Sequence, residues 1–444
     1  IWAPGDHELT TEQLSNLLRL YAPAVAVVCD DVLEAAKASL RDALGDAGSA
    51  QLLGETAWRA LLSGAAGDPA PPEGPVDDDA TSLLLLTSGT TGTPKSVMIS
   101  ARQLRTQAAK GIPLAPAGAR MVYFGTPAWI SYTTLFVRAL GNGGAMILGP
   151  GYSKDAYFQA VGRHQPEILF FWPDVILDFV ALPEPTQAHI AEFAKVLIYG
   201  GARAPVPALL RLCRALPNTM LFQAYGSSEI TGVSSLMPWH HSAAVQGGEA
   251  EQRRLRSAGK PGSKARVVDD DGQPVPPGTA GWIHARPDPA TTFQGYYKNP
   301  SATAKKYSSD GWLIMGDMGH LDEDGFLYID GRDSETIVLV SGDNVYPNEV
   351  EGAIADLPGV LDVAVAKVVL GDAIHEVGAF IRVREGSELS AEDVKAQCNK
   401  LLGQTWTHPT HIFFQTDKLP RNQNGKCLKA KLTERAAELL QQQA

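Results

Sequence analysis

The stretch LLLLTSGTTGTPKSV, from Leu83 to Val97, decides the fold. Its four leucines predict a strand that is apolar on both faces and therefore central and covered. The strand leads into a loop rich in Ser, Thr and Gly that closes on Pro94 and Lys95. Backbone N–H groups in such a turn, together with the hydroxyls, form a concave donor surface for phosphate oxygens. Lys95 adds a mobile positive charge, so the stretch predicts a phosphate-binding loop at the edge of a sheet.

This loop is not a P-loop of the GxxxxGK[ST] type. Gly89 and Gly92 are three residues apart, and Lys95 follows a proline rather than a glycine. Taken alone, a loop of this composition is as often an ordinary surface turn. That alternative stays open until the rest of the chain is considered.

The composition limits the class of protein. A chain of 444 residues with 44% hydrophobic and 20% charged residues predicts a globular protein of two or three domains. The net charge of −11 disfavours nucleic acid and anionic membrane as partners, since both require a basic face. The four cysteines lack zinc or disulfide spacing, and no apolar run is long enough to cross a membrane. We therefore expect a cytoplasmic protein that acts on a small molecule.

Alternating helical and strand-like segments fill residues 97–240, as in a doubly wound, mostly parallel sheet. After residue 257, strands joined by Gly/Asp turns indicate an antiparallel region. We therefore predict an α/β fold with a large domain over 1–333 and a small, mobile α+β domain over 334–444. Buried strands are expected at 144–149, 166–172, 194–201 and 219–226, and a helix at 10–20 followed by a short strand at 25–29.

Six stretches, in the same order along the chain, resemble the motifs of the adenylate-forming superfamily. That family contains acyl- and aryl-CoA synthetases, the adenylation domains of peptide synthetases, and luciferases. Six collinear matches make the surface-turn alternative untenable. They are TSGTTGTPK (87–95), YGSSE (225–229), GYYKNPSAT (295–303), DGWLIMGDMGHLDEDGFLYIDGR (310–332), SGDNVYPNEVE (341–351) and LPRNQNGK (419–426).

The resemblance implies that a substrate oxyanion attacks the α-phosphate of Mg-ATP, giving an adenylate and pyrophosphate. A carboxylate with a pKa near ~4 is already ionised at neutral pH, so no general base is needed. Catalysis then depends on positioning and on charge stabilisation at phosphorus. The implied cofactors are ATP, Mg²⁺ and CoA, whose thiol would accept the acyl group.

The resemblance also assigns roles to individual residues. Glu229 would ligate Mg²⁺, Ser228 would contact the α-phosphate, and Asp317 would hold the ribose hydroxyls, with Arg332 beside it. Tyr225, next to Gly226, would stack on adenine. The β- and γ-phosphates would be held by Thr87, Ser88, Thr90, Thr91 and Lys95, and the adenine would be lined by the backbone of Gly200, Gly201 and Ala202.

Lys426 is the residue on which we expect the chemistry to depend, together with Glu229 and Lys95. Its ammonium group can bridge the attacking carboxylate and the α-phosphate, provided that the small domain closes on the large one. In the family this domain then turns to a second pose for thiol attack. The pivot matches Ser334, where the family more often has Asp or Lys.

The acyl pocket of the family matches residues 126–135 and the strand before Tyr225. Here the chain reads Pro127-Ala128-Trp129-Ile130, without the His of many CoA ligases. The Asp that binds an α-ammonium group in amino-acid-activating domains is also absent, which argues against an α-amino acid. Core packing would explain the apolar candidates almost as well as an aromatic or medium aliphatic substrate would. These candidates are Trp129, Ile130, Phe171, Trp172 and Phe222.

Three functions are therefore weighed. The first is an acyl- or aryl-CoA ligase. The second is an enzyme that passes its adenylate to a carrier protein or another nucleophile, or activates an unusual oxyanion such as nitrite for diazotisation. The third, a member that only binds nucleotide, is disfavoured because Lys95, Glu229, Asp317 and Lys426 are all present. The N-terminal portion that usually precedes the helix at 10–20 is expected to be missing.

Overall fold

The chain forms two compact units. The first contains Ile1–Arg102, Pro127–Trp129 and Phe293–Thr303, and the second contains the remaining residues. A computed structural model describes residues 1, 3–4, 11–23, 25–28, 51–54, 56–57, 59–60, 77–87, 95–149, 151–332, 335–339, 341, 343–370, 374–402, 408–421 and 426–443.

The first unit contains two small sheets. Strands β1 (Val25–Val28) and β2 (Gln51–Gly54) pair in parallel. Strands β3 (Thr81–Thr87) and β4 (Lys95–Ser100) pair antiparallel. Its helices are α1 (Thr11–Tyr21), the start of α4 (Ala101–Lys110), and most of α12 (Pro300–Ala304).

The leucine-rich strand β3 differs in part from the prediction. Leu83, Leu84 and Leu85 are buried, which confirms that the strand is covered. The expected central position is not seen, because β4 is the only neighbour that β3 pairs with in the part of the chain that the structure describes. Burial on both faces produces a run of leucines, but it does not reveal how many strands are paired. The strands on either side of residues 88–94 are thus antiparallel, with Thr87 opposite Lys95.

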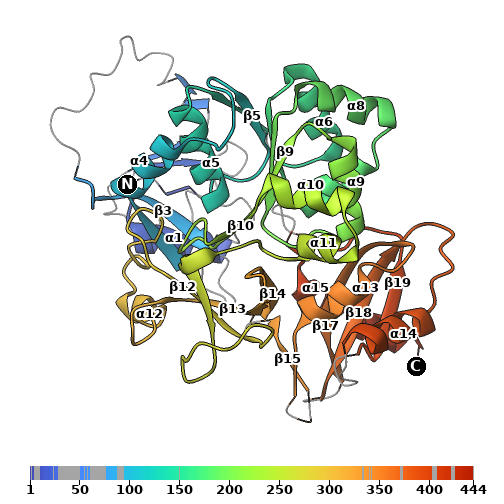
Figure 1. Cartoon of the computed structure of the whole chain (residues 1–444). Helices are drawn as coiled ribbons and strands as arrows, with labels where there is room; N and C mark the ends of the chain where they lie inside the picture. The colour runs from blue at the N-terminus through green and yellow to red at the C-terminus, as the bar shows by residue number, and fades with distance from the viewer. Residues whose placement is uncertain are drawn as a thin grey trace. The chain divides into compact units, whose positions relative to one another are not determined.

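The core of the second unit is a six-stranded sheet of order β10-β9-β8-β7-β5-β6. Strands β5, β9 and β10 of this sheet are labelled in Figure 1. All pairings are parallel except that of β10 with β9. Consecutive parallel strands are joined through helices, as the alternating pattern predicted. The strands are β5 (Arg120–Tyr123), β6 (Ala145–Leu148), β7 (Ile168–Phe171), β8 (Val196–Gly200), β9 (Met220–Tyr225) and β10 (Ser234–Leu236).

Helices cover this sheet and enclose an aromatic core. Tyr123, Tyr157, Phe171 and Phe179 are among the largest fully buried side chains. The helices are α5 (Ile130–Gly141), α6 (Lys154–His164), α7 (Pro173–Val180), α8 (Glu184–Phe193), α9 (Val206–Ala215), α10 (Pro238–Gln246) and α11 (Glu249–Arg253).

An antiparallel sheet follows, as the Gly/Asp turns predicted. Its strands lie in chain order, and Asp317 is opposite Arg332 in the register. The elements are β11 (Ala265–Val268), β12 (Gly281–Ala285), β13 (Leu313–Leu321) and β14 (Leu327–Arg332), preceded by the short 3₁₀ helices η2 (Arg254–Arg256) and η3 (Gly262–Lys264).

The C-terminal part is an α+β structure whose central strand alternates faces. Val363 and Val365 of β17 belong to a core cluster with α13 and α14, whereas Ala364 and Ala366 belong to a second cluster with α15. The elements are β15 (Ile337–Val338), β16 (Asn344–Val345), α13 (Pro347–Ile354), β17 (Val360–Leu370), β18 (Ile374–Val383), α14 (Ala391–Leu401), β19 (His411–Gln415) and α15 (Lys429–Gln443). Within the described residues, no helix is long and apolar enough to cross a membrane.

Candidate active site

A pocket of about 260 Å³ lies in the second unit and brings together residues from distant parts of the chain. Its walls come from the carboxyl ends of β8 and β9, from β13 and β14, and from the C-terminal structure. Seven residues predicted from the sequence line it: Gly201, Ala202, Tyr225, Gly226, Asp317, Arg332 and Lys426.

The parallel pairing of β8 and β9 positions the glycines and the tyrosine. Gly200 lies opposite Ala224 in the register, so the two strands end side by side. Gly201 then has a φ of +85°, a left-handed conformation that favours glycine. A Cβ atom on Gly226 would lie only 2.7 Å from the carbonyl oxygen of Ile230. The backbone is therefore compact where the strands end and Tyr225 enters the pocket.

Asp317 is held from both sides. The Tyr225 hydroxyl donates to Oδ2 at 2.6 Å, and Arg332 Nε donates to Oδ1 at 2.7 Å. The aspartate is only 3% exposed. Burial and the neighbouring carboxylate raise the pKa of Tyr225 well above its ordinary value, so the phenol stays a neutral donor. These contacts fix both carboxylate oxygens at the pocket wall, and ribose hydroxyls would have to share them.

Lys426 belongs to a chain of ion pairs, which we call the Glu335 cluster. Its Nζ lies 2.7 Å from Oε1 of Glu335, whose other oxygen lies 3.3 Å from Nζ of Lys429. Lys429 also lies 2.9 Å from Oε1 of Glu351. Burial raises the pKa of Glu335, but Lys429, Lys426 and Arg332 outweigh it and lower the pKa to about 2. Glu335 is therefore ionised at any working pH.

Three residues that line the pocket were not predicted from the sequence: Glu335, Glu351 and Lys429. Glu335 lies three residues after Arg332, and Glu351 closes a matched motif. Neither position predicts which lysine the carboxylate contacts.

Glu229 follows β9 in the turn after Tyr225. It is 8% exposed, and its Oε1 lies 3.7 Å from Nζ of Lys306. Ser228, its neighbour, is half-buried. Neither residue lines the pocket described above.

The remaining phosphate-loop candidates belong to the first unit. The hydroxyl of Thr87 donates to the carbonyl oxygen of Lys95 at 3.3 Å, across the pair that closes the hairpin. Nζ of Lys95 lies 5.3 Å from the centre of the Tyr296 ring, a cation–π contact. Four predicted residues, Ser88, Thr90, Thr91 and the pivot Ser334, lie outside the described residues.

Two family models match the chain. Residues 1–297 match the model described as AMP-binding enzyme, and residues 349–426 match the AMP-binding enzyme C-terminal domain. The chain belongs to the AMP-binding enzymes. The predicted resemblance to the adenylate-forming superfamily is thereby confirmed, and so is the predicted α/β fold with a large and a small domain.

Two relatives of this AMP-binding enzyme are acid–CoA ligases. It is 31% identical over 382 residues to the sulfoacetate–CoA ligase of Cupriavidus necator, which covers 83% of this chain and 70% of the relative. It is 30% identical over 403 residues to the indoleacetate–CoA ligase of Aromatoleum aromaticum, covering 88% and 75%. The chain is thus an adenylating enzyme of the AMP-binding family to which these acid–CoA ligases belong.

Solved structures have the same fold. ATP-bound MatB from Rhodopseudomonas palustris superposes with a TM-score of 0.81 at 23% identity, covering 99% of this chain and 84% of that one. The amide bond synthetase McbA from Marinactinospora thermotolerans gives 0.78 at 24% identity, covering 96% and 82%.

The residues predicted to form the acyl pocket lie elsewhere in this AMP-binding enzyme. Phe171, Trp172 and Phe222 are buried in the main hydrophobic core, and Trp129 and Ile130 are half-buried. None of the five lines the pocket at Asp317. Their role in substrate binding stays a prediction.

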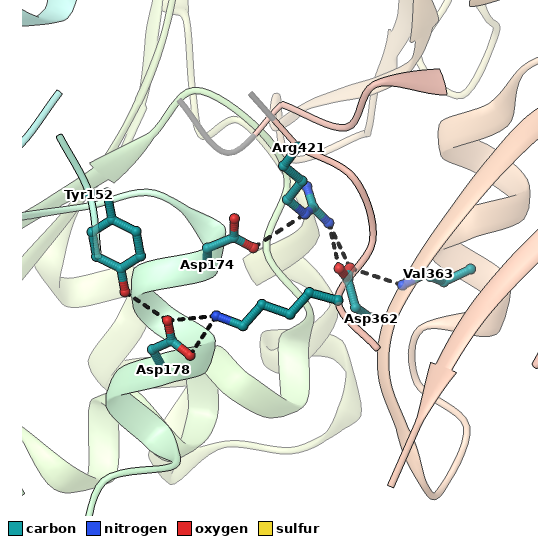
Figure 2. A network of polar contacts seen from close by, with 7 residues as sticks. Tyr152, Asp174, Asp178, Asp362, Val363 and Arg421 are labelled. Carbon is teal, nitrogen blue, oxygen red and sulfur yellow. Dashed lines mark hydrogen bonds and ion pairs between the residues drawn. The ribbon is translucent and has the colours of Figure 1, made fainter. Parts of the chain in front are cut away.

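A second ionic network joins the C-terminal part of the enzyme to helix α7 (Figure 2), and we call it the α7 cluster. Lys418 Nζ lies 3.0 and 2.9 Å from the two oxygens of Asp178, to which the Tyr152 hydroxyl also donates at 2.8 Å. Arg421 Nη2 contacts Asp362 at 2.7 and 2.8 Å, and its Nε lies 3.3 Å from Asp174.

Proposed function

We propose that the enzyme activates a small organic acid as an acyl-adenylate and then transfers the acyl group to the thiol of CoA. The observation that supports this best is the pocket wall shared by Tyr225, Asp317, Arg332 and Lys426. Tyr225 would stack on the base, Asp317 would accept from the ribose hydroxyls, and Arg332 would donate to the ribose and the phosphate. Lys426 brings a positive charge to the same pocket.

Each of these residues would act on a different part of the reactants. Asp317 would accept hydrogen bonds from the ribose hydroxyls, in exchange for part of its contact with Tyr225. Lys426 would keep one N–H directed at Glu335 and, with its other N–H groups, stabilise the charge that passes from the attacking carboxylate to the phosphate. Positioning and charge then supply the rate enhancement, because an ionised carboxylate needs no base.

The residues present are compatible with Mg²⁺. The ion takes hard oxygen ligands and is commonly held by one or two carboxylates together with phosphate oxygens and water. Glu229 offers such a carboxylate, and we propose that it would hold the ion in place of its 3.7 Å contact with Lys306. A bound Mg²⁺ would neutralise phosphate charge.

For the substrate we propose a chemical class, a small carboxylic acid. The acids named for the two relatives, sulfoacetate and indoleacetate, are carboxylates of small size. The apolar side chains of Trp129, Ile130, Trp172 and Phe222 favour an aromatic or medium aliphatic acid.

A different acceptor is the second candidate function. The stretch Pro127-Ala128-Trp129-Ile130 lacks the His expected beside the thiol channel. This favours transfer of the adenylate to a carrier protein or to another nucleophile.

ATP–pyrophosphate exchange tests the proposal. The panel would contain aryl, cinnamyl, medium-chain and amino acids, sulfoacetate, indoleacetate, 2-succinylbenzoate and nitrite, each with and without CoA. We expect one carboxylic acid to support exchange and CoA to drive AMP release. Exchange that CoA does not drive forward would favour the second candidate. Silence across the panel would overturn the adenylation proposal.

A further inference from the structure

Glu335 forms an ion pair with Lys426, and both residues line the pocket. We propose that Glu335 is a positioning residue, which holds the ammonium group of Lys426 at the pocket wall for the adenylation step. This inference rests on the proposed function. It assigns Glu335 no contact with substrate.

The geometry favours positioning because Glu335 is itself held in place. Its second oxygen lies 3.3 Å from Lys429 Nζ, and Lys429 lies 2.9 Å from Glu351. Glu351 Oε1 in turn accepts a hydrogen bond from the backbone N–H of Val365 at 2.8 Å. Lys426 is thus connected through three side chains to the middle of β17.

Lys426 needs such a partner. Its side chain is 35% exposed, whereas the side chains of Glu335 and Lys429 are 18% and 17% exposed. A lysine side chain is long and flexible, and a group misplaced by about 1 Å can lose roughly a hundredfold in rate. A carboxylate at 2.7 Å restricts where the ammonium group can lie. The second oxygen is occupied by Lys429, so Glu335 cannot turn freely towards solvent.

The substitution Glu335→Gln would break this arrangement while keeping the size of the side chain. Its amide oxygen could accept from one lysine, but its NH₂ group would face the other. Glu335→Asp keeps the charge but is one methylene shorter, so it cannot reach both lysines equally well. The two variants therefore separate the loss of charge from the loss of reach.

The first test is steady-state ATP–pyrophosphate exchange, using the panel acid with the highest wild-type rate. We expect Glu335→Gln to lower kcat by roughly ten- to a hundredfold with Mg-ATP affinity changed less than threefold, and Glu335→Asp to lie between it and wild type. Glu376→Gln is the matched control, since Glu376 pairs with His411 in the same domain, away from the pocket. A kcat for Glu335→Gln within twofold of this control overturns the proposal.

A double-mutant cycle separates positioning from a purely structural role. If Glu335 acts through Lys426, adding Glu335→Gln to Lys426→Ala should lower single-turnover adenylate formation no further. If Glu335→Gln lowers the rate in the Lys426→Ala background by as much as it does alone, Glu335 has an independent role and the proposal is overturned.

Trace acetylation with acetic anhydride, followed by mass spectrometry, tests the contact between Glu335 and Lys426 without requiring enzyme activity. Lys426 should be acetylated at least threefold faster in Glu335→Gln than in Glu376→Gln, because the carboxylate no longer shields the amine. Equal rates would overturn the proposal. An inactive wild-type enzyme that still shows this difference would place the failure in the proposed function instead. If Glu335→Gln does not fold, Glu335→Asp replaces it in the exchange and acetylation measurements.

Discussion

The α7 cluster and the Glu335 cluster take side chains from neighbouring positions in the sequence. Lys418 and Arg421 belong to the first cluster and Lys426 to the second, yet the two clusters are built differently. In the α7 cluster the central charges are enclosed, because the side chains of Asp178 and Arg421 are only 9% and 10% exposed. In the Glu335 cluster one carboxylate is shared between two ammonium groups, and all four side chains line the pocket. Of the α7 cluster, Arg421 and Asp362 also line it, whereas Asp174 and Asp178 do not.

The difference indicates which measurement each cluster should affect. Breaking an enclosed ion pair leaves a charge without its partner in a poorly solvated place, which lowers stability. A shared carboxylate at a pocket wall can lose one partner and keep the other. Substitutions of Asp174 and Asp178, which do not line the pocket, should therefore change the free energy of unfolding, and substitutions in the Glu335 cluster should change catalysis.

The largest expected effect is that of Lys426→Ala. Adenylate formation should fall by about a thousandfold or more, since charge stabilisation at the reacting phosphate is lost. Mg-ATP affinity should change only a few-fold. The unfolding free energy should stay nearly constant, because Glu335 keeps Lys429.

Single-turnover adenylation and calorimetric titration of Mg-ATP measure these two effects. Lys431→Ala is the matched control, as Lys431 is an exposed lysine on helix α15, which begins three residues after Lys426. Normal turnover in Lys426→Ala would remove this lysine from the mechanism.

Asp317→Asn should have the next largest effect. The amide keeps the size of the side chain, but its NH₂ group faces either Tyr225 or Arg332 and cannot accept from a ribose hydroxyl. We expect the Kd of Mg-ATP to rise by roughly ten- to a hundredfold, the worth of a hydrogen bond to a charged group. Titration of ATP against the variant, with 2′,3′-dideoxy-ATP as comparison, measures it. A wild-type preference for ATP that persists in the variant would exclude Asp317 from ribose binding.

The sequence predicted the fold best where local pattern and tertiary environment agree. Ile168–Phe171 is continuously apolar, and it forms a strand in the middle of the six-stranded sheet. The leucines of β3 are equally apolar, yet that strand has a single paired neighbour in the described structure. Hydrophobicity reports burial, and strand pairing depends on other segments that the local sequence does not specify.

The same distinction holds for the candidate site. Tyr225, Asp317, Arg332 and Lys426 were predicted from motifs, and the structure brings them to one pocket. Glu335 was missed, because charge complementarity between residues far apart in sequence leaves no local pattern. The pairing of Asp178 with Lys418 was missed for the same reason.

Asp178→Asn should lower stability. Asp178 Oδ2 accepts from the Tyr152 hydroxyl and from Lys418, and Oδ1 accepts from Lys418 as well; asparagine removes the negative charge and one of the two contacts with Lys418. The expected loss is about 1–3 kcal/mol of unfolding free energy, as for a hydrogen bond to a charged group. Exchange activity under stabilising conditions should remain within a few-fold of wild type. Urea unfolding at pH 7.5 measures the loss, and unchanged stability would show that the α7 cluster contributes nothing to folding.

Asp174→Asn, one turn away on α7, should have the smallest effect and the opposite sign. Burial, opposed by Arg421 but assisted by Asp362, raises the pKa of Asp174 to about 6. The unfolded chain has an ordinary value near ~3.9. Above pH 6 Asp174 is ionised in both states, and burial of its charge lowers the free energy of unfolding. This loss shrinks as the pH drops from about 6 to 4, because the folded state binds a proton there before the unfolded state does.

The Asp174→Asn variant avoids that cost, and Arg421 keeps its two contacts with Asp362. We expect it to be more stable than wild type by about 1–2 kcal/mol at pH 8, with the gain fading towards zero near pH 4. Urea unfolding at pH 8, 6 and 4.5 measures the trend, with the exposed Asp271→Asn as control. A loss of stability at pH 8 would mean that the ion pair with Arg421 outweighs the burial of Asp174, and that both aspartates of α7 stabilise the cluster in the same way.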